Sequence, residues 1–205
     1  AGLCFASLGS DTGGSIRFPS AANGVTGLKP TWGRVSRHGV FDLAPTLDHV
    51  GPMCRTAADA GAVLGVIAGA DGNDPTASSL PVPNYLAGLE RGLNGLRIGI
   101  DPTYNRRGVD DTMMAAVKSA LAVFRAMGAD VREVTFPNTD GVVDEWTAHC
   151  GIETAYAHRD TYPKHKDRYG PALSGLIDLG HSLSATDYQE ILLHRHDFCG
   201  NVRAL

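Results

Sequence analysis

The stretch Gly9–Arg17 constrains this chain most, because it places an adjacent glycine pair directly before a serine, Ser15. Adjacent glycines allow positive φ angles and the close approach of another group to the backbone. Successive N–H groups in such a turn can form a concave nest that attracts negative charge. A serine hydroxyl beside preorganised N–H donors is the arrangement that acyl transfer requires. The stretch therefore indicates either a nucleophilic serine with an oxyanion site or a glycine-rich turn with an ordinary serine.

Two other loop motifs are excluded for this stretch, because their consensus sequences do not match it. A phosphate-binding P-loop needs a lysine directly before its final serine or threonine, and Gly14 occupies that position before Ser15. A nucleophile elbow needs a glycine two residues after the serine, and Arg17 occupies that position. Spacing alone leaves the two interpretations of Ser15 open.

Composition excludes several other classes of protein. The 205 residues are 43% hydrophobic, which is enough to bury a substantial core. A net charge of −4 argues against a general nucleic-acid or membrane surface. No apolar run approaches the ~20 residues that a membrane span needs. The 4 cysteines lie far apart without a C-x-x-C motif, which favours free thiols in a reducing cytosol over disulfides or a metal site.

Local patterns predict short elements in the first part of the chain. Residues 1–9 predict a helix end and then a short buried strand that leads into the glycine-rich loop. Frequent glycines and prolines over 19–52 allow only short strands and turns. The segment 56–69 predicts a helix with Thr56 as its N-cap, followed by a polar loop over 71–83.

A strand–helix–strand unit is predicted next. Residues 96–100 alternate as a strand, a helix runs from Asp110 or Asp111 to Gly128, and 131–136 predict a second strand. Elements of these lengths form a βαβ unit, whose two strands are parallel.

Helical patterns dominate the remainder. Beyond Gly141 the chain is predicted to be helical, and Ser184 with Asp187 forms a capping box. In the helix that ends at Gly128, an apolar stripe beginning at Met113 is predicted to face the core.

The motifs around the glycine-rich stretch resemble those of the amidase signature family in order and spacing. The resemblance rests on Gly9–Arg17, Phe18–Ser20, Gly27–Thr31, Gly33–Ser36, Leu47–Met53 and Arg55–Asp59. It implies an α/β fold with a mixed, mostly parallel central sheet flanked by helices. It also implies a serine hydrolase whose triad is a nucleophilic serine, a second serine after a cis peptide bond, and a lysine.

The resemblance assigns roles to individual residues. It makes Ser15 the nucleophile and places the oxyanion hole at the backbone N–H groups of Thr12, Gly13, Gly14 and Ser15. The family's bridging serine and lysine precede this motif. We therefore expect residues 1–205 to be part of a single amidase domain truncated at both ends, and inactive when expressed alone.

The reaction implied is hydrolysis of a carboxylic amide to an acid and ammonia or an amine, through an acyl-enzyme on Ser15. The implied substrate is a small molecule, with no cofactor, metal, nucleic acid or membrane partner, and the location is cytoplasmic. A homodimer is one arrangement left open. The alternatives are the A subunit of the glutamine-dependent tRNA amidotransferase and a non-catalytic member that keeps the fold.

Two charged residues flank the loop, and neither they nor the other polar candidates are expected to take part in the chemistry directly. Asp11 and Arg17 are expected to support the loop backbone rather than contact substrate directly. Lys29 matches a lysine of the family that is not the catalytic one, so a structural role is expected. The histidines are expected at core or surface positions, because His194 and His196 are two residues apart on a predicted helix and face different directions.

Overall fold

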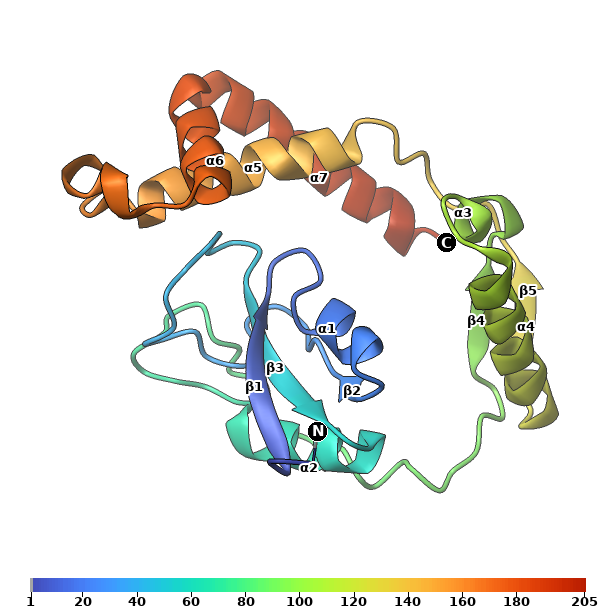
Figure 1. The fold of residues 1–205 in the computed structure, drawn as a ribbon. Helices are drawn as coiled ribbons and strands as arrows, with labels where there is room; N and C mark the ends of the chain where they lie inside the picture. Colours follow the sequence, from blue (N-terminus) through green and yellow to red (C-terminus); the bar gives the residue numbers. More distant parts are fainter. Residues whose placement is uncertain (1) are drawn as a thin grey trace. The chain divides into compact units, whose positions relative to one another are not determined.

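The computed structural model describes residues 2–205, which form two compact units. One unit comprises the described residues up to Ala87 together with Val143–Ile191. The other comprises Gly88–Val142 and Leu192–Leu205. Figure 1 shows the helices and strands of both units.

A three-stranded antiparallel sheet lies in the first unit, with the order β1 (Ala6–Asp11), β3 (His49–Cys54), β2 (Thr26–Gly27). The register pairs Asp11 with His49, so β1 and β3 lie side by side (Figure 1). The strand predicted to lead into the loop is confirmed in place, but its predicted burial is wrong. The helix end predicted before it is also wrong over 2–5, and Ala1 lies outside the described residues. Only Asp11 of β1 is buried, and Ser7, Leu8 and Ser10 are exposed, because the strand pairs only with β3 and lies at the sheet edge.

The short elements predicted after the loop are also present. Helix α1 covers only Arg17–Ala22. Helix α2 covers Ala57–Ile67, and the Thr56 hydroxyl accepts the N–H of Asp59 at 3.1 Å, which confirms the predicted cap. Leu64 of α2 is buried against Val35 and against Val50 of β3, so this helix covers the sheet.

The helical segment of this unit begins with α5 (Val142–Ala157) and continues through two short 3₁₀ turns to α6 (Pro171–Ser182). Helix α6 crosses α5 (Figure 1), and Gly151 of α5 meets Gly180 of α6 at the crossing. A Cβ on Gly151 would lie 3.0 Å from the Leu176 carbonyl oxygen, so the close crossing requires glycine there. The 3₁₀ turns are Tyr162–Lys164 and Lys166–Arg168.

The last helix, α7 (Ala185–Arg203), begins at the predicted capping box. The Asp187 N–H donates to Ser184 Oγ at 3.1 Å, and the Ser184 N–H donates to the Asp187 carboxylate at 2.6 Å. These reciprocal bonds satisfy N–H groups that the first helical turn leaves unpaired.

The second unit contains the predicted βαβ arrangement. Strands β4 (Arg97–Ile100) and β5 (Asp130–Glu133) pair in parallel, and α4 (Asp111–Ala126) connects them. A short helix, α3 (Pro102–Arg106), was not predicted. The prediction that Met113 is a core residue is wrong, since its side chain is 55% exposed. The two short strands are too small to cover the whole stripe. The α/β class is confirmed.

Candidate active site

The glycine-rich loop follows β1 directly and leads into α1. Gly14 has a φ of +143°, in the region that favours glycine. Gly13 is a glycine for a different reason. A Cβ on Gly13 would lie 2.8 Å from Cη2 of Trp146, so the missing side chain makes room for the indole ring.

Asp11 holds the two ends of the loop together. Its side chain is fully buried, and Oδ2 accepts the Ile16 N–H at 3.2 Å and the Arg17 Nε–H at 3.0 Å. Oδ1 accepts from the other side of the same guanidinium at 3.0 Å. Burial raises the pKa of Asp11, but the bonds from Arg17 and Ile16 outweigh it and hold this pKa below its usual range. The pair is therefore ionised and joins the start of the loop to its end.

A pocket of about 510 Å³ opens over this loop. Ser15 is exposed there, and the structure brings it together with the three residues predicted to share its oxyanion site. The pocket is lined by Thr12, Gly13, Gly14, Ser15, Phe18, Pro19, Leu43 and Trp146. Asp11 and Arg17 are not among these lining residues.

A second buried carboxylate, Asp48, holds the other side of the loop. The Thr12 hydroxyl donates a short hydrogen bond to Asp48 Oδ1. Asp48 Oδ2 accepts the N–H groups of Leu43 at 2.8 Å and Ala44 at 3.0 Å. Asp48 lies in one of the motifs that carry the resemblance, yet sequence reasoning gave it no role. Its partner is 36 positions away, which no local pattern shows.

A third carboxylate, Glu153 of α5, fixes the segment that carries Leu43. Glu153 Oε1 lies 2.6 Å from the Thr46 hydroxyl, 2.8 Å from His149 Nε2 and 2.8 Å from the Tyr188 hydroxyl. Burial raises the pKa of Glu153, but the hydrogen bonds from His149, Thr46 and Tyr188 outweigh it and lower the pKa to about 2. Sequence reasoning missed this cluster too, because Thr46 and Glu153 are 107 positions apart.

The remaining candidates lie apart from the pocket lining. Lys29 donates from Nζ to the Pro30 carbonyl at 3.3 Å, and burial together with the charge of Arg17 lowers its pKa. His49 Nδ1 lies 3.2 Å from the Asp11 carbonyl oxygen. Burial raises the pKa of Cys150 to about 12, so its thiol is not a nucleophile at neutral pH.

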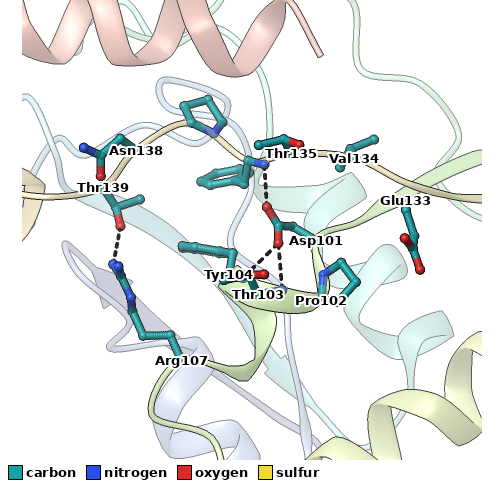
Figure 2. Close-up of a pocket in the computed structure, with 12 residues that line it drawn as sticks. Asp101, Pro102, Thr103, Tyr104, Arg107, Glu133, Val134, Thr135, Asn138 and Thr139 are labelled. Carbon is teal, nitrogen blue, oxygen red and sulfur yellow. Dashed lines mark hydrogen bonds between the residues drawn. The ribbon is translucent and has the colours of Figure 1, made fainter.

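Other kinds of site find little support in residues 2–205. No group of three or more His, Cys, Asp or Glu side chains in this range is arranged to hold a metal ion. No helix in it is both long and apolar enough to cross a membrane. Another pocket, of about 630 Å³, lies in the second unit, where Asp101 faces the Phe136 backbone (Figure 2).

Comparison with known proteins identifies the family of this chain. The family model for Amidase matches residues 1–197. The chain belongs to the amidase family. A Mycobacterium tuberculosis protein named as the putative amidase AmiD is 47% identical over 204 residues, which are 99% of this chain and 42% of that protein. This amidase chain thus spans less than half the length of that relative.

Two further relatives show the breadth of the family. The glutamyl-tRNA(Gln) amidotransferase A subunit of Geobacter sp. is 48% identical over 138 residues, which are 67% of this chain and 28% of that one. The solved peptide amidase of Stenotrophomonas maltophilia has a TM-score of 0.75 and 31% identity, over 93% of this chain and 44% of that one. The fold expected from the resemblance, that of the amidase signature enzymes, is confirmed.

Proposed function

We propose that this chain carries the nucleophile and the oxyanion site of an amide hydrolase that forms an acyl-enzyme on Ser15. The observation that supports it is the shared pocket of the exposed Ser15 and the backbone of Thr12, Gly13 and Gly14. A serine beside a glycine-formed turn has donors ready where negative charge develops. Membership of the amidase family gives the reaction that such a site performs.

The steps follow from this arrangement. Ser15 Oγ loses its proton to a base and attacks the amide carbonyl carbon, so that the carbonyl electron pair moves onto oxygen. The N–H groups of Thr12, Gly13, Gly14 and Ser15 stabilise this oxyanion. The C–N bond then breaks, and the nitrogen leaves with a proton as ammonia or an amine. Water attacks the resulting ester and releases the acid and Ser15.

The base is assigned by the family resemblance alone. In the amidase signature family a lysine acts through a second serine, and we assign neither role to a residue of this chain. Lys29 keeps the structural role expected from its motif, because it does not line the pocket and bonds to the Pro30 carbonyl.

Three carboxylates support the loop in this proposal. Asp11, paired with Arg17, joins the start of the loop to the start of α1. Asp48 holds the Thr12 hydroxyl, and Glu153 fixes the neighbouring segment through Thr46. Preorganised donors cost no rearrangement when the reaction occurs, so such bracing contributes to the rate.

We extend the proposal to a small-molecule amide substrate, a cytoplasmic location and, as one arrangement, a homodimer. The role of the A subunit of a tRNA-dependent amidotransferase is the second candidate, because a relative with that name shares 48% identity. A stand-alone amidase is favoured, since the alignment with AmiD covers 99% of the chain, whereas those with A subunits cover between 67% and 86% of it.

The test measures ammonia release from a panel of amides by the complete protein and by two serine variants. Ser15→Ala is expected to lower kcat by about a thousandfold or more, because a nucleophile cannot be replaced by its neighbours. Ser10→Ala is the matched control, since Ser10 is exposed on β1 and does not line the pocket. Its activity should stay within about twofold of wild type. Turnover that survives in Ser15→Ala would contradict the proposal.

A further inference from the structure

Trp146 is the largest side chain that lines the Ser15 pocket, and it comes from a helix far away in sequence. Its ring lies against Gly13, where an added Cβ would be 2.8 Å from Cη2 and 3.2 Å from Cε2. The side chain is 40% exposed, so part of the indole remains open to the pocket. An aromatic surface therefore lies beside the proposed oxyanion site.

The rest of the pocket lining is uncharged. Phe18 is 78% exposed at the pocket, and Pro19 and Leu43 line it as half-buried apolar residues. The nearest charges along the loop, Asp11 and Arg17, are bonded to each other, and Asp11 is fully buried. A charged acyl group would lose water here without gaining a partner, which is unfavourable.

The position of Trp146 is fixed by the rest of α5. Trp146 and Glu153 are seven residues apart, so they lie on the same face of the helix. On this face the Glu153 carboxylate accepts two hydrogen bonds from Thr46, one from its backbone N–H at 2.9 Å and one from its hydroxyl at 2.6 Å. Thr154 donates to the Leu43 carbonyl at 3.0 Å. These bonds tie the helix that carries Trp146 to the segment that carries Leu43.

We infer that Trp146 determines substrate specificity by stacking on a flat, apolar acyl group, so that the preferred substrates are aromatic carboxamides. The inference rests on the proposed function and names the substrate class of that same site. Aromatic rings gain from offset or edge-to-face contact beyond the area they bury. The uncharged lining offers no partner to the carboxylate and ammonium groups of free glutamine, so we expect glutamine to be a poorer substrate than an aromatic amide.

The experiment compares kcat/KM for benzamide, acetamide and glutamine in the complete protein and in Trp146→Ala and Trp146→Phe. Wild type should prefer benzamide to acetamide. Trp146→Ala should lower kcat/KM for benzamide about 10- to 100-fold and that for acetamide by less than about threefold. Trp146→Phe should recover most of the preference. Tyr156→Ala is the matched control, because Tyr156 is a 62% exposed aromatic residue on the same helix that does not line the pocket.

The benzamide-to-acetamide ratio is the decisive readout, because the fraction of folded enzyme cancels from it. A ratio unchanged by Trp146→Ala, or a wild type that prefers glutamine, would overturn the inference. Either result would leave the proposed function intact, provided that wild type hydrolyses amides and Ser15→Ala does not. If wild type hydrolyses no amide, the proposed function itself fails.

Discussion

The Ser15 pocket and the pocket of the second unit use their carboxylates in opposite ways. In the second unit, Asp101 lines the pocket, and its oxygens accept the N–H groups of Thr103, Tyr104 and Phe136 (Figure 2). That carboxylate is the N-cap of α3. In the Ser15 pocket, the carboxylates lie behind the loop and leave the serine exposed.

This difference shows why size does not identify the site. The Asp101 pocket is the larger, at about 630 Å³ against about 510 Å³. The Asp101 carboxylate in it is already paired with the chain's own backbone, so it stabilises the fold. Around Ser15, the paired carboxylates Asp11 and Asp48 lie behind the loop. They hold the loop in place and leave Ser15 exposed to the pocket. Four substitutions test this contrast, from the largest expected effect to the smallest.

Gly14→Ala should have the largest effect. An added Cβ has room, with Phe18 Cβ at 3.9 Å, but the φ of +143° is strained for alanine. The loop should rearrange and misplace a donor, which lowers kcat about 100- to 1,000-fold. Gly39→Ala is the control, because Gly39 has a φ of +78° and open space around it. It should lose stability but keep its kcat, and a Gly14→Ala variant with full kcat would contradict the account.

Gly13→Ala should have the next largest effect, through Trp146. The new methyl group would displace the indole ring and lower kcat/KM for benzamide about 10- to 100-fold. A double-mutant cycle with Trp146→Ala sharpens the test, because the two changes remove the same contact. Their combined effect should be smaller than the sum of the two free-energy changes. Additive effects would show that the ring and the loop act independently.

Glu153→Gln tests whether the bonds between Glu153 and the Thr46 segment stabilise the fold, with the free energy of unfolding as the readout. The folded-state pKa of Glu153, about 2, lies below the ordinary value of 4.5. The ionised carboxylate therefore adds to the free energy of unfolding above pH 4.5, and this stabilisation is lost as the pH falls towards 2. The variant should lose about 1–3 kcal/mol of unfolding free energy at neutral pH. The deficit should shrink in acid, as urea unfolding at several pH values would show. Asp160→Asn, at an 80% exposed side chain, should show no such pattern, and a pH-independent deficit in Glu153→Gln would contradict the assignment.

Asp101→Ala should have the smallest effect on activity. It removes the N-cap of α3 and lowers stability, which thermal or urea unfolding would measure. Turnover should remain within about twofold of wild type. A large loss of kcat in a well-folded variant would give the pocket of Figure 2 a part in catalysis and break the contrast.

Sequence reasoning succeeded where the signal was local. The caps at Thr56 and Ser184 and the parallel strands β4 and β5 follow from neighbouring residues, and all are confirmed. The bracing by Asp48 and Glu153 could not be predicted, because their partners come from distant segments that only the folded chain brings together. Gly13 is the instructive case. The sequence shows a glycine pair, but only the structure shows that one serves a φ angle and the other a tryptophan ring.

Covalent labelling of the complete protein with a fluorophosphonate probe, followed by peptide mapping, tests the central claim most directly. The probe reacts with an activated serine, because its phosphorus takes the place of the carbonyl carbon. We expect label on Ser15, which is exposed in the pocket, and none on the buried Ser20. Label on Ser7, Ser10 or Ser20 in place of Ser15 would contradict it.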